Sequence, residues 1–108
     1  MSNYFFQDPE LFDEAGLKKY WEQETSSRLQ ALANRLESLP DYSHSSIETA
    51  LRQLAEDLKL KPTNLIHPAR LALSGRTIGP GLFEMMDVLG RETVVRRLRR
   101  AGERVKVV

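Results

Sequence analysis

One arginine lies next to a glycine-rich segment in the second half of the chain, and these residues are the first candidates for chemistry. Arg70 precedes the segment 75–81, Gly-Arg-Thr-Ile-Gly-Pro-Gly, by five residues and stands at the border of an apolar stripe. A planar guanidinium can donate hydrogen bonds to a base edge or a phosphate, and a ligand can approach a glycine-rich backbone closely. Two interpretations stay open at this point. Arg70 binds a ligand, or it has a structural role in which it snorkels or pairs with Glu84 or Asp87.

The remaining chemical groups predict no catalytic residue and no metal site. The glycine-rich segment lacks the Gly-Lys-Ser/Thr ending of a P-loop, and no strand is predicted before it. His44 and His67 are far apart, and neither has a second histidine at helical spacing with which to bind a metal. We expect His44 to be a solvated turn residue, His67 to lie at a helix start, and the carboxylates to occupy solvated helix faces. The absence of cysteine excludes disulfides, thiolate-bound zinc and a thiol nucleophile.

The length and composition are those of one small soluble domain. Of the 108 residues, 41% are hydrophobic and 29% are charged, a mixture that can build a packed core and argues against disorder. No apolar run approaches the roughly 20 residues of a membrane-spanning helix, and the N-terminus has neither the basic start nor the apolar stretch of a signal peptide. We therefore expect a cytoplasmic protein with no membrane partner.

The net charge of +1 conceals an asymmetry between the two halves of the chain. Residues 1–54 contain five Lys/Arg and nine Asp/Glu, which gives −4, and residues 55–108 contain 11 and six, which gives +5. Eight of these 11 cations are arginines, the side chain best suited to planar contact with phosphates and base edges. The pattern is compatible with an RNA or DNA partner for the C-terminal half.

The apolar residues recur at helical spacing without long period-two alternation, so the sequence predicts an all-α fold, a small helical bundle. A first helix is expected to start at Asp8-Pro9 and to be weakened at Gly16. Further helices are expected at about residues 25–40, 45–59, 65–73, 82–89 and 92–103. The core of this monomeric domain is expected to contain Leu51, Leu54, Leu58, Leu65, Ala72, Leu73, Leu89 and Leu98.

Three local patterns lead to specific expectations within these helices. Ser45 followed by Glu48 indicates a capping box at the start of the third helix. Pro68 is tolerated only if it lies in the first turn of its helix. In the last helix, apolar residues such as Val94 and Leu98 face inward and the arginines fall on the other side, where we interpret most of them as a solvated face. These arginines are Arg96, Arg97, Arg99 and Arg100.

Three motifs in the second half resemble the C-terminal end of bacterial-type glutamyl-tRNA synthetases. In that family they read approximately Pro-Leu-Arg-x-Ala-Leu-Thr-Gly, Pro-x-Leu-Phe-Glu and Leu-Gly-Lys-Glu, followed by an Arg-Leu helix. In this chain they are residues 68–75 (Pro-Ala-Arg-Leu-Ala-Leu-Ser-Gly), 79–84 (Gly-Pro-Gly-Leu-Phe-Glu) and 89–92 (Leu-Gly-Arg-Glu). The resemblance is strong from about Leu51 to Ala101, with a weaker lead-in at residues 4–6 and 17–20.

The resemblance implies an α-helical cage that binds the tRNA anticodon in a class I aminoacyl-tRNA synthetase, a ligase that uses ATP to attach glutamate to its tRNA. The His-Ile-Gly-His and Lys-Met-Ser-Lys-Ser type motifs of the family's catalytic half are absent. We therefore expect no cofactor in this chain itself, with ATP bound elsewhere in the parent enzyme. The expected partners are tRNA and the rest of the synthetase chain. Residues 1–44 would form a helical lead-in, residues 45–104 the anticodon-binding subdomain and residues 105–108 a tail.

The same resemblance implies which residues contact the anticodon: Arg70, Gly79, Pro80 and Leu82. The family often has a hydroxyl residue where Gly79 stands, so only backbone contacts carry over at that position. Single-stranded RNA is read by unstacking its bases against apolar surfaces and hydrogen-bonding their edges, which suits Leu82 and Arg70. Two other functions stay open: a stand-alone helical DNA-binding module whose last helix enters the major groove, and a helical protein-interaction domain.

Overall fold

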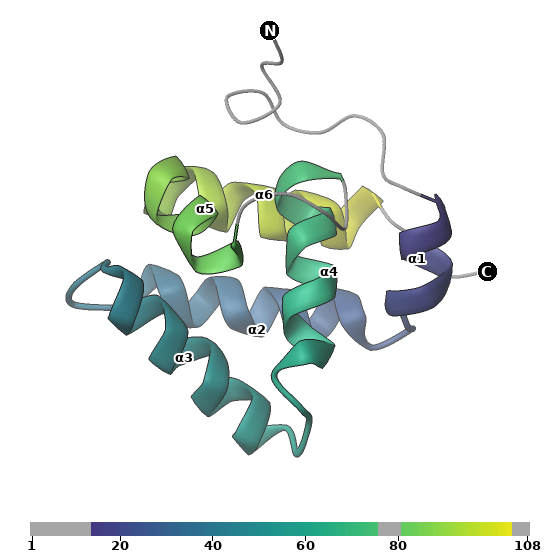
Figure 1. Ribbon diagram of the computed structural model, residues 1–108, viewed down its shortest axis with the longest axis horizontal. Coiled ribbons are helices and arrows are strands. Elements are labelled where there is room, and N and C mark those ends of the chain that lie inside the picture. Colours follow the sequence, from purple (N-terminus) through teal and green to yellow (C-terminus); the bar gives the residue numbers. More distant parts are fainter. Residues whose placement is uncertain (1–13, 76–80, 105–108) are drawn as a thin grey trace, which may run out of the picture.

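Six helices and no strand make up the part of the chain that the computed structural model describes, residues 14–75 and 81–104 (Figure 1). The helices are α1 (Glu14–Tyr20), α2 (Thr25–Glu37), α3 (His44–Asp57), α4 (Thr63–Ser74), α5 (Leu82–Leu89) and α6 (Arg91–Arg104). The all-α prediction is confirmed. No described helix combines the length and apolar composition needed to cross a membrane.

The first helix differs from the expectation. The weakening expected at Gly16 does not break the helix, because α1 continues through this buried glycine from Glu14 to Tyr20. The expected helix start at Asp8 lies outside the described residues.

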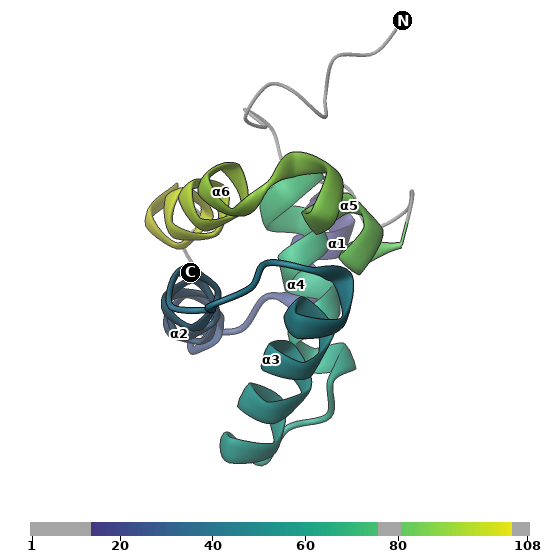
Figure 2. The same cartoon turned by 90° about the vertical axis from the view of Figure 1, so that its left-hand side faces the viewer.

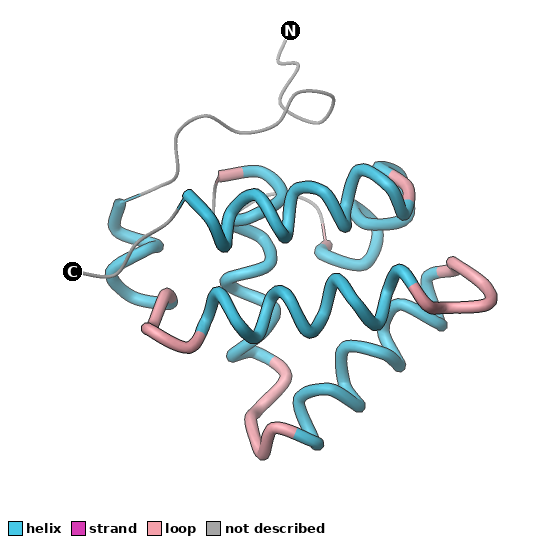
Figure 3. Tube along the Cα trace, turned by 180° about the vertical axis from the view of Figure 1, so that it is seen from behind, coloured by secondary structure: helices cyan, strands magenta, loops and turns pink. Residues whose placement is uncertain are grey.

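The helices form two layers, and α2 and α6 lie antiparallel in one of them (Figure 2). Ser26 near the start of α2 lies beside Gly102 near the end of α6, and Arg91 at the start of α6 reaches the carbonyl of Leu39, just beyond α2. Figure 3 shows this pair from behind, with the other helices packed on its far side. α1 packs beside α4 at one end of the molecule (Figure 1).

One apolar core lies between the two layers. Its fully buried side chains include Leu32 from α2, Leu51 from α3, Leu73 from α4 and Leu98 from α6. Burial of each such leucine contributes about 1.5–3 kcal/mol of transfer free energy. The division of the chain after residue 44 stays a prediction, and both sides of it contribute to this one core.

Two of the expected core residues are not fully buried, and the other six are. Leu89 is half-buried against the core, and Leu58 is 41% exposed. Leu58 is exposed because α3 ends at Asp57, two residues before the expected end, and the chain then turns away from the helix. Leu60, two residues further along, packs against the core in its place.

The end of α3 has the hydrogen-bond pattern of a Schellman motif, in which a left-handed residue closes the helix. The backbone N–H of Lys59 donates to the carbonyl of Glu56 at 3.0 Å, and that of Leu60 donates to the carbonyl of Ala55 at 2.8 Å. Lys59 has φ of 59°, a conformation that costs a residue with a Cβ about 1–2 kcal/mol and that glycine adopts freely. This turn brings Leu60 back to the core.

Ser43 caps α3, so the prediction of a capping box starting at Ser45 was wrong. The Ser43 hydroxyl oxygen accepts a hydrogen bond from the backbone N–H of Ser46 at 3.3 Å. Ser45 therefore lies inside the helix, and Glu48 accepts a hydrogen bond from Arg52 at 2.9 Å instead of reaching back to a cap. Both serines have good capping chemistry, and the earlier one is the cap in the structure.

Pro68 lies inside α4 and beyond its first turn, contrary to the expectation. Because Pro68 has no backbone N–H, the carbonyl of Asn64, four residues earlier, has no hydrogen-bond partner within the helix. Asn64 is exposed near the start of the helix, where water can hydrogen-bond to that carbonyl. The ring of Pro68 is buried, so it contributes apolar surface to the core.

Candidate functional site

Arg70 lies on the narrow accessible side of α4. Most residues of this helix from Leu65 onward are buried, whereas Ile66, His67 and Arg70 are half-buried. His67 and Arg70 are three residues apart and lie on the same face of the helix. Among the described residues, the Arg70 guanidinium makes no hydrogen bond and no ion pair, so the alternative pairing with Glu84 or Asp87 is not found. Its donors are therefore available to a ligand from outside the described part of the chain.

The C-terminal turn of α4, which follows Arg70, is held in place by neighbouring groups. Gly75 closes the helix in the left-handed conformation, with φ of 76°. The Ser74 hydroxyl donates a hydrogen bond to the carbonyl of Arg70 at 3.0 Å. From α6, the Nη1 atom of Arg97 donates to the carbonyl of Leu73 at 2.7 Å. The bond from Arg97 satisfies a carbonyl that the helix end leaves free, and it ties this turn to α6.

Arg97 is only 1% exposed, so the expectation that it lies on the solvated face of α6 was wrong. It follows Val94 by three residues and precedes Ala101 by four, which places it on the buried stripe of the helix. The spacing thus contained the signal, and the charged residue type concealed it. A buried guanidinium needs hydrogen-bond partners, and the end of α4 supplies one of them.

The outer arginines of α6 interact within the protein. Arg99 donates to both carboxylate oxygens of Glu37, at 3.0 and 3.2 Å, and to Asn34 at 2.9 Å. The hydrogen bond from Arg99 and its positive charge lower the pKa of the Glu37 carboxyl group. Arg96 and Arg100 also have interactions within the chain. These contacts fit a solvated helix surface, with arginines that interact within the protein, better than they fit a free phosphate-binding surface.

At the start of α6, Arg91 contacts the segment between α2 and α3. Its Nη2 atom donates to the carbonyl of Leu39 at 2.7 Å, and its guanidinium lies 5.4 Å from the ring centroid of Tyr42. The Tyr42 hydroxyl donates to the carbonyl of Met86 at 3.0 Å, and burial of this hydroxyl raises its pKa. Arg91 is therefore occupied by structural contacts.

An open groove of about 640 Å³ runs along the outer face of α6. Four arginines line it, but Glu37, Glu92 and Glu103 lie among them. Because three carboxylates interrupt the positive charge, this groove is a poor match for a polyanion.

The second part of the predicted site lies at the start of α5. Leu82, the first residue of α5, is 3% exposed and packs in the core, and Gly81 before it is exposed. Gly79 and Pro80 lie outside the described residues. The anticodon contacts assigned to Gly79, Pro80 and Leu82 stay predictions, and the burial of Leu82 favours packing of its side chain beneath such a site.

The end of α1 places Tyr20 against His67 of α4 and Lys19 beside Tyr20. Tyr20 stacks on His67 with ring centroids 4.2 Å apart and an angle of 19° between the rings. The Nζ atom of Lys19 lies 5.4 Å from the centroid of the Tyr20 ring. Sequence reasoning did not single out Lys19 or Tyr20, although the lead-in motif at residues 17–20 was an available signal. We call Lys19, Tyr20, His67 and Arg70 the α1–α4 cluster.

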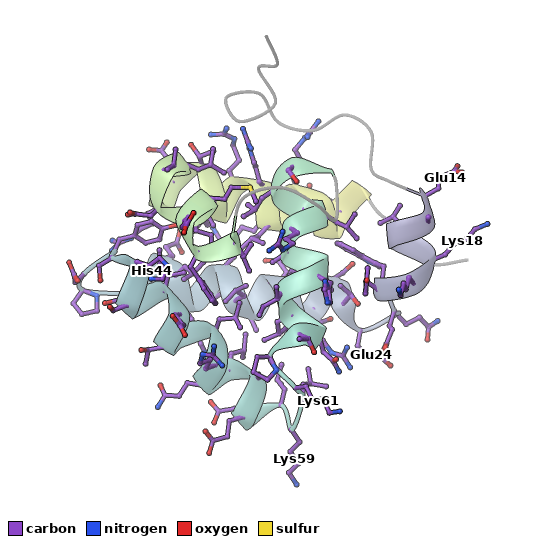
Figure 4. The ribbon with its side chains drawn as sticks, viewed as in Figure 1. Glu14, Lys18, Glu24, His44, Lys59 and Lys61 are labelled. Carbon is purple, nitrogen blue, oxygen red and sulfur yellow. The ribbon has the colours of Figure 1, made fainter. Side chains whose placement is uncertain are left out.

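Both histidines lie in helices. His44 is exposed as expected, but it is the first residue of α3 and not a turn residue (Figure 4). Its ring centroid lies 5.7 Å from that of half-buried Phe83, in an edge-to-face arrangement. His67 lies in the second turn of α4, where burial and then the charges of Arg70 and Lys19 lower its pKa. Within residues 14–75 and 81–103, no group of three or more His, Asp or Glu side chains is placed to hold a metal ion.

Known proteins match this arrangement in sequence and in structure. The chain is 46% identical over 99 residues to a glutamate–tRNA ligase of Chlorobium phaeovibrioides, covering 92% of this chain and 19% of that protein. It is also 46% identical over 99 residues to glutamate–tRNA ligase 1 of Syntrophomonas wolfei, covering 91% of this chain and 20% of that protein. The chain thus spans about a fifth of the length of these curated relatives.

Solved structures extend the match to the fold. The crystal structure of a glutamate tRNA ligase from Elizabethkingia meningosepticum, in complex with its amino acid, superposes with a TM-score of 0.91 at 35% identity, over 95% of this chain and 20% of that one. A glutamate-tRNA synthetase from Elizabethkingia anophelis gives a TM-score of 0.78 at 30% identity, over 94% of this chain and 19% of that one. The family model described as the anticodon binding domain matches residues 1–102. The chain therefore belongs to the anticodon-binding domain family.

Proposed function

We propose that this chain recognises the anticodon loop of glutamate tRNA as one domain of a glutamate–tRNA ligase. The observation that carries the proposal is the match to such ligases at 46% identity over 92% of the chain, together with the anticodon-binding family model over residues 1–102. Because the chain spans about a fifth of these relatives, the remaining four fifths would carry the chemistry of the ligase.

The environment of Arg70 supports this function. Its guanidinium lies on the accessible side of α4 with no partner among the described residues. Hydrogen bonds to the edges of unstacked bases are the main source of sequence-specific RNA recognition, and a guanidinium provides paired donors for them. Arg70 would read a base edge in this way.

Activation and transfer of glutamate would take place in the part of the ligase that this chain does not cover. The chain itself would then need neither ATP nor another cofactor, and it would act as a monomeric domain attached to the rest of the synthetase in the cytoplasm. The expected aminoacylation activity of the 108-residue chain alone is at background level. Turnover above background would contradict this assignment.

The alternative of a DNA-binding module gains no support from α6. A recognition helix must present free side chains to the major groove. In α6, Arg97 is buried and Arg99 is bonded to Glu37 and Asn34 on the neighbouring helix α2.

A titration at several salt concentrations tests the proposed function against both alternatives. The probes are an anticodon stem-loop of glutamate tRNA, the same loop with an altered anticodon, and duplex DNA of random sequence. We expect the cognate loop to bind more tightly than the altered loop and the duplex. Preference for the duplex would replace the proposal with DNA binding, and absence of salt-dependent binding to all three would favour a protein-interaction domain.

A further inference from the structure

The α1–α4 cluster combines positive charge with aromatic surface at one accessible place. Lys19 is exposed, and Tyr20, His67 and Arg70 are half-buried. The two aromatic rings are stacked at 4.2 Å, with Lys19 on one side of the stack and Arg70 one helical turn from His67. Burial and then the charges of Arg70 and Lys19 lower the pKa of His67, in agreement with both cations lying near it.

The charge of the cluster is not neutralised within the described residues. Neither Lys19 nor Arg70 makes a hydrogen bond or an ion pair there. On α6, in contrast, Arg99 is bonded to the carboxylate of Glu37. Unneutralised cations beside flat rings are what a single-stranded nucleic acid requires, because phosphates are bound by the cations and bases stack on the rings.

We propose that Lys19, Tyr20 and His67 form a subsite for the nucleotide next to the base that Arg70 reads. This inference rests on the proposed function, and it adds a partner for α1. Lys19 contacts the phosphate of that nucleotide. His67, supported from behind by the ring of Tyr20, offers its remaining ring surface and edge to the base. The helix α1 therefore takes part in RNA binding through the residues at its C-terminal end.

The neighbouring lysine provides a matched control. Lys18 is exposed like Lys19 and belongs to the same turn of α1, but it projects away from the body of the molecule at the outer side of that helix (Figure 4). Lys18→Ala and Lys19→Ala therefore remove the same charge from the same helix end, but only Lys19 is a member of the cluster. Since both side chains are exposed, neither change should affect folding.

The experiment measures affinity of the 108-residue chain for the glutamate anticodon stem-loop at several salt concentrations. Lys19→Ala should weaken binding about three- to tenfold and reduce the slope of log affinity against log salt by roughly 0.7, the value for one phosphate contact in a single strand. Lys18→Ala should change affinity less than about twofold. Equal effects of the two changes would overturn the phosphate contact.

The base contact of His67 is tested with RNA as well as with protein variants. His67→Ala should weaken binding about 5- to 20-fold with no change in the salt slope, and His67→Phe, which keeps a flat ring on Tyr20, should recover most of the loss. A set of RNA loops, each lacking a different base, identifies the contacted nucleotide. The loss of affinity caused by His67→Ala should disappear for the loop that lacks the base contacted by His67. An unchanged affinity of folded His67→Ala, with helix content confirmed by circular dichroism, would overturn the base contact.

The outcome separates this inference from the proposed function. If the wild-type chain does not prefer the cognate loop, the proposed function fails and the subsite fails with it. If the wild-type chain prefers the cognate loop and Arg70→Ala weakens it, while Lys19→Ala matches Lys18→Ala and His67→Ala matches wild type, the subsite alone is wrong.

Discussion

Arg70 on α4 and the arginines on α6 differ in their partners. Arg97 is buried and bonded to the carbonyl of Leu73, and Arg99 is bonded to Glu37 and Asn34. Arg70 has no such partner among the described residues. The most arginine-rich helix is therefore tied into the fold, and the isolated arginine is the one available to a ligand. Counting basic residues along a sequence therefore overestimates α6 as a binding surface and overlooks Arg70.

The largest effect is expected for the buried arginine, Arg97, and it is an effect on stability. Arg97→Ala removes a core side chain and leaves the carbonyl of Leu73 without this donor, so it should lower the free energy of unfolding by about 2–4 kcal/mol. Arg97→Lys keeps one donor and should recover part of the loss. Urea unfolding followed by circular dichroism measures both. A loss below about 0.5 kcal/mol for Arg97→Ala would place Arg97 with the solvated arginines.

A change away from both regions separates loss of stability from loss of binding. Ser43→Ala removes the cap of α3 and should lower the free energy of unfolding by about 1 kcal/mol, while affinity for the anticodon loop stays unchanged. Ser45→Ala, two residues further along, should have little effect because Ser45 lies inside the helix. Chemical denaturation and RNA titration check the pair. If Ser45→Ala were the more costly change, the cap would be assigned wrongly.

The smallest effect is expected for the exposed pair of Arg99 and Glu37. The pKa of Glu37 is lowered from its ordinary value of 4.5, so the pair stabilises the fold when the carboxylate is charged. The stability difference between wild type and Glu37→Gln should be present at pH 7 and lost as the pH falls through the folded-state pKa. It should also shrink with added salt. Thermal unfolding at pH 7 and pH 3 measures the difference, and a difference that grows at low pH would have the wrong sign.

The helices themselves could be predicted from the sequence because their apolar residues recur at fixed spacing. The apolar stripes of α2, α5 and α6 each contain several leucines, valines or methionines at helical spacing. This periodicity is clear in the sequence, whatever turns adjoin the helices. The ends of α3 were not predictable at this level. Ser43 and Ser45 are equivalent caps locally, and the left-handed Lys59 ends the helix where glycine would be the usual signal.

The site was predictable only in part, because its residues depend on tertiary packing. The isolation of Arg70 beside a glycine-rich segment was visible in the sequence, and its accessible position agrees with a binding role. The burial of Arg97 depends on the end of α4 lying against α6, which no local pattern specifies. The stack of Tyr20 on His67 joins residues from α1 and α4 and depends in the same way on the packing of the two helices.

The role of Arg70 is tested most directly by the ratio of affinities for the cognate glutamate anticodon loop and a loop with an altered anticodon. In Arg70→Ala, the free energy of binding to the cognate loop should become about 1–3 kcal/mol less favourable, and the ratio of the two affinities should move towards one. In Arg99→Ala, any loss should be small, equal for both loops and absent at high salt. A folded Arg70→Ala variant that loses affinity equally for both loops, or an Arg99→Ala variant that narrows the ratio, would contradict the assignment of base recognition to Arg70.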